Sequence, residues 1–383
     1  MEWWQLVVGI VVGLLLLMII VTIHELGHAL MARRNKVVVE EFGLGFPPRA
    51  RVLGKYKGTL VTLNWLPIGG FCKLKDEFDS ADSKGSYGSA GFWAKTQILL
   101  AGVTANALLA VVIFTILALF GMPKMVENQF TMPSDTAIIK SPVRIANMPD
   151  PDSPAGKVGL QQGDEITAID GQIIDDSTLL PKITEQKKGE VVNIEYRRGG
   201  QVVSQDVELR DGSNGGYLGV SVGQSETFRA TWSAPIVGVV NTGQFMWWTL
   251  QSLGNLAVNF VGGLAGTLSF DSATRENAQA SLSKAGDSVS GPVGILGVIF
   301  PNAMMSGLTQ LMFISGIISL TLAIMNLLPI PGLDGGRWLL TAIFRLIKKP
   351  LTEDLEAKIN GFGMLFLYAL ILLITVVDVA KLW

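Results

Sequence analysis

Residues 6–32 read LVVGIVVGLLLLMIIVTIHELGHALMA, an apolar run that contains the motif HELGH at residues 24–28. The run is long enough to span a bilayer as a helix, which takes about 20 residues. The motif holds both histidines of the chain, and residues four apart share a helix face. Both imidazoles can therefore reach one metal ion, with Glu25 between them as a general base. A chance motif or two buried core histidines would be the alternative, but ionisable groups inside a membrane helix are costly and functional by default.

The composition also indicates a membrane protein. Of 383 residues, 49% are hydrophobic and only 16% are charged, against about 25% charged in soluble domains. The net charge of −2 gives no indication of a nucleic-acid partner. The single cysteine, Cys72, excludes an intramolecular disulfide framework and a cysteine-rich zinc site.

Four segments are apolar and long enough to cross a bilayer. They are residues 6–32, 97–120, 307–328 and 362–380. Basic residues gather after the first segment (Arg33, Arg34, Lys36, Arg49, Arg51, Lys55 and Lys57) and after the third (Arg337, Arg345, Lys348, Lys349 and Lys358). By the positive-inside rule both of these loops are cytoplasmic. Residues 121–300 and both termini are then expected outside.

The stretch 230–270 has no charged residue and is also long enough to cross. A fifth crossing would invert everything after it and put the basic 337–358 loop outside. Polar residues recur in this stretch at spacings of seven and four, which predicts a polar helix face; they are Gln244, Gln251, Asn255 and Asn259. We expect one or two amphipathic helices lying on the outer membrane surface, with a re-entrant hairpin as the alternative.

Residues 143–223 differ in character, since charges, glycines and alternating strands return. Residues 193–197 and 202–209 predict a hairpin around Gly199-Gly200. The segment resembles a bacterial PDZ domain in DSPA (152–155), GL (159–160), GDEI (163–166), IDG (169–171) and, as a carboxylate-binding loop, GYLGV (216–220). The resemblance implies capture of a peptide C-terminus by strand addition, and a steric filter that binds no peptide is an equal alternative.

Residues 37–76 are strand-like and rich in glycine, with candidate strands at 37–42, 59–64 and 69–74. We predict a small β-structure on the cytoplasmic face beside the first helix. Its role is either a structural cap or pairing with an extended substrate strand.

A catalytic zinc ion normally has three protein ligands and an open position for water. Because both histidines are already used, the third ligand must be Asp, Glu or Cys72. The strongest candidate is Asp334 in NLLPIPGLDGG (326–336), where prolines break the third span. The histidines lie roughly 7–14 Å inside the cytoplasmic boundary, and the third span ends at the same leaflet, so Asp334 can reach their depth. Alone, Asp before Gly-Gly is ordinary turn chemistry; Cys72, beside Lys73, is the weaker candidate.

Together these motifs resemble the site-2 protease family of intramembrane zinc metalloproteases, and most closely its bacterial RseP-like (regulator of sigma-E protease) branch. Further matching patches are PIGGF (67–71), AG (101–102) with Asn106, and SGPVGI (290–295), which together cover most of the chain in the family's order. The resemblance implies that His24, His28 and Asp334 bind Zn²⁺ and that Glu25 is the general base.

The resemblance also has implications for substrate binding. It implies that Asn326 and Pro331 hold substrate backbone near the zinc. It implies that the β-structure, with Gly69, Gly70 and Phe71, pairs with the substrate, and that the outer amphipathic helix gates access. The chain departs from the family at Val103, where a proline is usual, and in having space for one PDZ domain rather than two.

We therefore predict a polytopic α-helical membrane protein with four transmembrane helices, a cytoplasmic-side membrane-associated β-structure and one extracytoplasmic PDZ domain of α+β class. The predicted divisions are a first transmembrane helix with HELGH (1–36), the β-region (37–90), a second transmembrane helix (91–122), a linker (123–142), the PDZ domain (143–223), membrane-surface helices and a loop (224–300), a third transmembrane helix with LDGG (301–340), a cytoplasmic loop (341–360) and a fourth transmembrane helix (361–383).

The function expected from the resemblance is hydrolysis of a peptide bond within the transmembrane segment of single-span proteins, such as anti-sigma factors already trimmed outside. The expected location is the bacterial inner membrane, in contact with lipid, with both termini and the PDZ domain outside and the active site near the cytoplasmic leaflet. A catalytically inactive PDZ scaffold is the alternative, which the intact Glu25 and the three candidate ligands disfavour. A zinc transporter is a third class, which the lack of repeated halves disfavours.

Overall fold

The computed structural model describes residues 2–148, 150–212, 216–267, 272–287 and 290–381. The chain divides into two compact units, Met1–Phe120 with Trp232–Trp383 and Gly121–Thr231. Each unit buries its own hydrophobic cluster, so each is described by itself.

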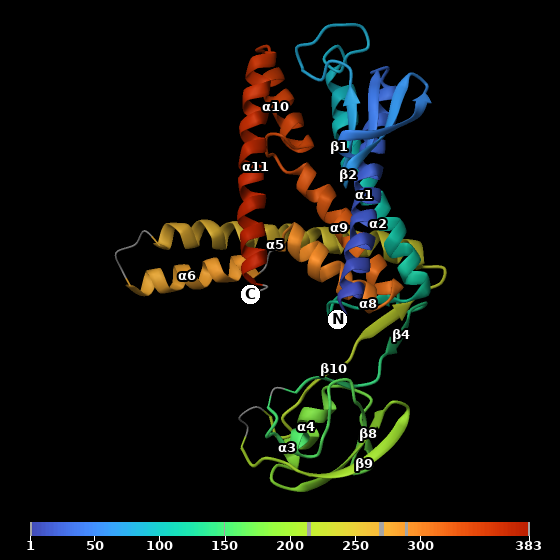
Figure 1. Cartoon of the computed structure of the whole chain (residues 1–383), viewed down its shortest axis with the longest axis vertical. Helices are drawn as coiled ribbons and strands as arrows, with labels where there is room; N and C mark the ends of the chain where they lie inside the picture. Colours follow the sequence, from blue (N-terminus) through green and yellow to red (C-terminus); the bar gives the residue numbers. More distant parts are fainter. Residues whose placement is uncertain (1, 149, 213–215, 268–271, 288–289, 382–383) are drawn as a thin grey trace. The chain divides into compact units, whose positions relative to one another are not determined.

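The first unit contains the predicted membrane segments as four long apolar helices, each able by length and composition to cross a membrane. They are α1 (Trp3–Arg34), α2 (Phe92–Phe120), α9 (Leu308–Leu327) and α11 (Glu353–Lys381). A helix satisfies its own backbone hydrogen bonds, which a spanning segment requires. The helices α1 and α9 both pack on α2 (Figure 1). The helix α11 contacts chiefly α7 (Pro292–Gly294).

Two helices occupy much of the segment 341–360 that the sequence predicts as a loop. The helix α10 (Asp334–Leu346) runs into it, and α11 begins at Glu353 rather than at residue 362. The charged residues of this segment lower its mean hydropathy, so it does not look like a membrane span, but they do not oppose helix formation. The acidic residues Glu353, Asp354 and Glu356 even favour a helix start, because carboxylates interact well with the N-terminal dipole.

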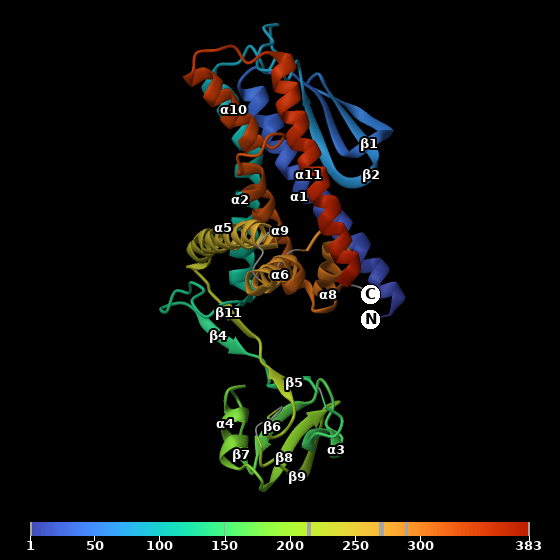
Figure 2. The ribbon, with the colours of Figure 1, turned by 90° about the vertical axis from the view of Figure 1, so that its left-hand side faces the viewer.

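The β-structure predicted beside the first helix consists of two long strands rather than three short ones. They are β1 (Val39–Tyr56) and β2 (Thr59–Leu74), which pair antiparallel and pack beside α1 (Figure 2). Residues 39–44 of β1 pair on one side with 70–74 and on the other with 60–63. Pro47 and Pro48 fall between the paired positions Phe46 and Arg49, where a proline removes no ladder hydrogen bond. Residues 70–74 therefore form one outer edge of this sheet.

The chargeless stretch 230–270 forms one helix, α5 (Ala234–Thr267), with α6 (Ser272–Asp287) packed along it (Figure 1). The described helices that meet the criteria for a membrane span do not include α5. Its N-terminal half packs on α2, where Gly238 lies against Thr115 and the ring of Phe245 packs at a tilt against that of Phe114. Its C-terminal half exposes Val258 and Val261. The N-terminal half of α5 therefore anchors this helix to α2, and it also contacts α9 through Phe245 and Phe313.

The chain then returns to the bundle through three short helical elements. They are α7, a π-helical turn η1 (Ile295–Ile299) and α8 (Phe300–Met305). Pro301 and Phe300 lie directly against Gly9 and Gly13 of α1, where a side chain on either glycine would collide with them. These two glycines let α8 approach the backbone of α1.

The second unit is built on an antiparallel sheet with the strand order β10-β5-β6-β8-β9 and with β7 paired to β6 (Figure 2). The strands are β5 (Arg144–Asn147), β6 (Glu165–Ile169), β7 (Gln172–Ile173), β8 (Val191–Arg198), β9 (Gln201–Glu208) and β10 (Ser221–Gly223), with helices α3 (Pro154–Lys157) and α4 (Leu179–Gln186). The predicted hairpin is confirmed as β8–β9, and both turn glycines, Gly199 and Gly200, have positive φ as a two-residue turn requires.

A small second sheet lies within the same unit. Its strand order is β3-β11-β4, formed by β3 (Met122–Pro123), β11 (Glu226–Arg229) and β4 (Ala137–Lys140). The segment 123–142, expected as a linker, thus contributes paired strands to the unit.

Candidate metal centre

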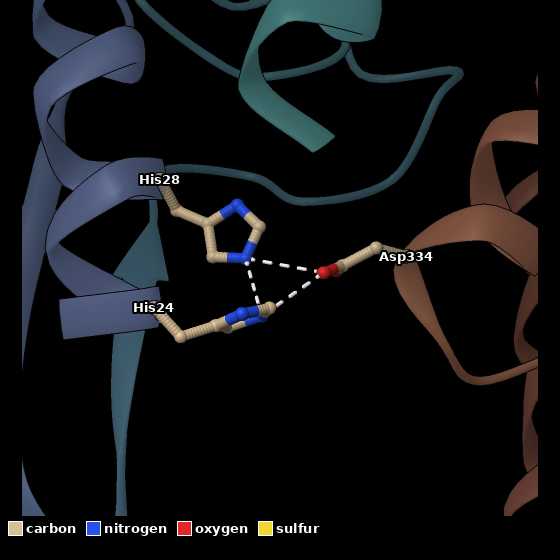
Figure 3. A group of neighbouring side chains, drawn as sticks. All are labelled: His24, His28 and Asp334. Carbon is tan, nitrogen blue, oxygen red and sulfur yellow. Dashed lines mark hydrogen bonds and ion pairs between the residues drawn. The ribbon is translucent and has the colours of Figure 1, made fainter. Parts of the chain in front are cut away.

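Two imidazoles and one carboxylate converge in the first unit (Figure 3). His24 and His28 lie one turn apart on α1, and Asp334 is the first residue of α10. His24 Nε2 lies 3.1 Å from His28 Nε2 and 3.1 Å from Asp334 Oδ2. His28 Nε2 lies 3.3 Å from the same carboxylate oxygen. The three atoms thus form a nearly equilateral triangle, and both histidines are buried.

The dimensions of this triangle fit a zinc ion. Ligand atoms at 2.0–2.1 Å from a tetrahedral zinc lie about 3.3 Å from one another, and the three distances here are 3.1, 3.1 and 3.3 Å. Two imidazoles with one carboxylate form a common ligand set of catalytic zinc, which keeps its fourth position open. Among the residues that the structure describes, this is the one cluster of histidine, cysteine and acidic side chains with such spacing.

Backbone packing positions Asp334. The chain turns sharply between α9 and α10, with Gly332 at a φ of 94°. A Cβ at Gly335 would collide with the carbonyl of Leu327, and a Cβ at Gly336 would collide with that of Ile330. The Gly-Gly pair therefore lets the first turn of α10 pack against the end of α9, which holds the preceding carboxylate toward α1.

Close packing of α2 positions the histidines. A Cβ at Gly27 of α1 would lie 2.5 Å from the carbonyl oxygen of Ala101 on α2. A Cβ at Gly102 would lie 2.5 Å from His28 Nε2 and 2.6 Å from His24 Nε2. His28 Nδ1 lies 2.8 Å from the carbonyl oxygen of Ile98. This contact orients the ring and leaves Nε2 as the metal-facing nitrogen.

A cavity of about 230 Å³ opens beside the triangle. Its lining comes from α1, β2, α9, α10 and the loops that follow β2 and α9, and it comprises His24, Glu25, His28, Cys72, Leu74, Glu77, Asn326, Gly332, Asp334 and Arg337. Cys72 and Leu74 of β2 line the same cavity as Glu25. The edge of the β-structure therefore lies beside the candidate general base.

Not every residue predicted for substrate binding lines this cavity. Asn326 does, whereas Pro331, Gly69, Gly70 and Phe71 are not part of the lining that the described residues form. A Cβ at Gly70 would nevertheless lie 3.8 Å from Glu25 Cγ, so this glycine flanks the base. Cys72 lines the cavity, but its sulfur lies outside the ligand triangle. Burial and the nearby Glu25 raise the pKa of the Cys72 thiol, which disfavours the thiolate that a metal requires.

Two charged residues of the cavity were not predicted from the sequence. Arg337 donates a hydrogen bond of 2.8 Å to the backbone oxygen of Glu77, and its guanidinium lies over the ring of Tyr87. The sequence feature that could have identified Arg337 as a cavity residue is its position one helical turn after Asp334. The position of Glu77 depends on the fold of the loop after β2, for which the sequence carries no motif.

This fold and this site define a class of protein, the membrane zinc metalloproteases. The chain belongs to peptidase family M50, the site-2 proteases, whose family model matches residues 12–370. A relative from Clostridium perfringens, provisionally described as a zinc metalloprotease, is 28% identical over 372 residues, covering 97% of this chain and 98% of the relative. The zinc metalloprotease RasP of Geobacillus kaustophilus is 25% identical over 450 residues, covering 94% and 95%.

Among solved structures, the PDZ domain of an SdrC-like protein from Listeria monocytogenes matches 21% of this chain and 86% of its own length, with 28% identity and a TM-score of 0.19. The family and the named relatives identify this chain as a zinc metalloprotease with Zn²⁺ as its cofactor.

Proposed function

We propose that this protein hydrolyses a peptide bond within the membrane segment of single-span proteins, with zinc held by His24, His28 and Asp334. The observation that carries the proposal is the ligand triangle. Two of its members belong to α1, a helix apolar enough to cross a membrane, and their ligand atoms match the spacing around zinc. Ionisable groups in such a helix are functional by default.

Glu25 is the proposed general base. Zinc, when bound, lowers the pKa of a coordinated water and polarises the scissile carbonyl. The Glu25 carboxylate lies in the same cavity and takes the proton of the attacking water, then gives it to the leaving amine.

The β-structure is proposed to hold the substrate in an extended form. A membrane helix hides its carbonyls in internal hydrogen bonds, so it must unwind before cleavage. Residues 70–74 form a sheet edge, and two of them, Cys72 and Leu74, line the cavity. Strand addition at this edge would replace the lost hydrogen bonds, with Gly69, Gly70 and Phe71 beside the incoming strand. Asn326, which lines the cavity, and Pro331 are also proposed to contact its backbone.

The second unit is proposed to act as a PDZ-like module outside the cytoplasm. A cavity of about 570 Å³ lies between α4 and the edge strand β10, and residues 216–222 form one wall. An edge strand facing a helix suits a peptide C-terminus added as a further strand. A steric filter is the alternative. A peptide-binding module predicts that a C-terminal peptide binds the full-length protein, and a steric filter predicts that it does not. We also propose that α5 lies on the outer membrane surface, with both termini outside.

Reconstitution into vesicles with a single-span substrate tests the protease proposal. Glu25→Gln should retain zinc and lose cleavage by about 10²–10⁴-fold, because proton transfer supplies that much of the rate. Asp334→Ala should lose both zinc and cleavage. The exposed Glu190→Gln is the matched control and should cleave like wild type.

Each alternative class predicts another result. A scaffold would bind substrate without cleavage in wild type, and a transporter would move zinc into empty vesicles. Equal cleavage by wild type and Glu25→Gln would refute the role of Glu25, and full zinc retention by Asp334→Ala would refute that ligand.

A further inference from the structure

One buried amide beside the metal centre has an unmet hydrogen bond. Asn106 of α2 is fully buried, and its Oδ1 has no hydrogen-bond partner among the residues that the structure describes. Its Nδ2 lies 3.4 Å from Nδ1 of His24. A buried polar atom without a partner destabilises the fold, so its presence at a functional site requires an explanation.

The chemistry of a zinc ligand supplies this explanation. His24 can offer Nε2 to a metal only when the ring proton is on Nδ1, which makes Nδ1 a donor. The Nδ2 group of Asn106 is also a donor, so in this orientation two donors face each other. A half-turn of the amide about its last side-chain bond exchanges the two atoms. It brings Oδ1 to Nδ1–H, so the amide oxygen and the imidazole N–H become each other's hydrogen-bond partner.

The neighbouring histidine, His28, already has an oxygen acceptor at its Nδ1. His28 Nδ1 lies 2.8 Å from the backbone oxygen of Ile98, also on α2. Ile98, Gly102 and Asn106 follow at intervals of four, so they share one face of that helix. The first supplies a backbone oxygen to His28, the last places its side-chain amide against His24, and the glycine between them leaves space for both rings. One helix face thus contacts both histidines.

We propose that Asn106 is a positioning residue for His24: its side-chain carbonyl accepts the Nδ1 proton and fixes the tautomer whose Nε2 binds zinc. This inference rests on the proposed zinc site and adds to it a residue that does not touch the metal. Groups that hold a ligand histidine in this way typically contribute 10–100-fold to metal affinity.

The test is zinc affinity of the purified full-length protein, measured by competition with a chelator. Asn106→Leu should weaken zinc binding by about 10–100-fold, while the melting temperature of the zinc-free protein does not fall, because a polar atom without a partner is removed. Asn106→Asp should bind zinc within about threefold of wild type, since a carboxylate accepts the same proton.

Ser319→Ala is the matched control. The Ser319 hydroxyl donates to the backbone oxygen of Asn106 at 2.9 Å, so its loss disturbs the packing of the same turn without touching the amide. It should leave zinc affinity unchanged. Wild-type affinity in Asn106→Leu would overturn the inference, as would equal weakening in Asn106→Asp or in Ser319→Ala.

His24→Ala separates this inference from the proposed function. If wild type binds zinc and His24→Ala does not, the zinc site stands and the Asn106 variants decide the inference alone. If His24→Ala binds zinc as tightly as wild type, the zinc site itself is wrong, and the role of Asn106 is overturned with it.

Discussion

Gly102 shows how a residue without a side chain supports a metal site. Any Cβ at this position would lie within 2.6 Å of the Nε2 atoms of both histidines, well inside contact distance. We expect Gly102→Ala to displace the imidazoles and to weaken zinc binding by at least about tenfold, in line with other changes that disturb ligand orientation. Chelator competition on the full-length protein measures this.

The control for that substitution is Gly243→Ala. Gly243 is also helical, but a Cβ there would meet open space, so the change should leave zinc affinity as in wild type. Unchanged affinity in Gly102→Ala would show that α2 can move away from the histidines at little cost. The steric account of this helix face would then be wrong.

The ligand candidates could be found in the sequence because two chemical constraints act together. The HELGH spacing predicts a shared helix face, and the lack of a third histidine requires another ligand type. The structure brings Asp334 to these histidines and leaves the Cys72 sulfur outside the cluster. The sequence could not predict that Glu77 and Arg337 would line the cavity, since their contacts join elements far apart in the chain.

At the scale of elements, α11 is held near its C-terminal end by one buried carboxylate. Asp378 is 4% exposed and accepts hydrogen bonds from the backbone N–H groups of Gly291 (3.1 Å) and Gly294 (2.8 Å). A Cβ on Gly291 would lie 2.9 Å from the carboxylate, so the glycine permits this approach. The patch SGPVGI, singled out in the sequence for its family resemblance, thus binds the last spanning helix to α7.

Loss of this carboxylate should loosen α11. We expect Asp378→Ala to lower the free energy of unfolding by about 1–3 kcal/mol, because two buried N–H groups lose their acceptor. Thermal melting of the protein in detergent measures the effect. Asp354→Ala, which removes an exposed carboxylate of the same helix, should leave the melting temperature nearly unchanged. Equal melting of both variants would contradict the anchoring role.

Helices and strands could be predicted from the sequence where a simple physical requirement determines their type and length. A spanning helix needs length and apolar composition, and all four predicted spans are helices that meet both requirements. The β-region was harder, because Pro47, Pro48 and several charges obscure the second half of β1. The helix α10 was missed for a similar reason, since Asp334-Gly335-Gly336 is typical of a turn. Its helical start depends on tertiary packing against α9.

At the scale of the whole molecule, the two units differ in what stabilises them. The second unit buries Asp164, which is 2% exposed, within a network of hydrogen bonds. Burial alone would raise the pKa of Asp164, but hydrogen bonds from Arg198 and from the Gln161 N–H outweigh it and hold the pKa below its usual range. The folded state therefore favours the ionised carboxylate.

The sign of the pH effect follows from this shift. A carboxyl group whose pKa is lower in the folded state stabilises the fold above its unfolded pKa of about 3.9, and the stabilisation is lost as the pH falls further. We expect hydrogen-exchange protection of β6 and β8, corrected for intrinsic rates, to fall below about pH 4. Asp164→Asn should make this acid dependence shallower. An equally steep dependence in the variant would assign the effect to other carboxylates.

Because the candidate zinc ligands and the Asp164 network belong to different compact units, their stabilities should be separable. At neutral pH, Asp164→Asn weakens the ion pair between the buried Asp164 and the partly exposed Arg198, and we expect it to destabilise the second unit by about 1–2 kcal/mol. Exchange should then accelerate in β6 and β8 but not in α2, and zinc affinity should stay as in wild type. Asp206→Asn, an exposed position on β9, is the control and should change neither readout. A parallel loss of zinc affinity in Asp164→Asn would mean that the two units unfold as one, and the second unit would then be part of what holds the metal centre together.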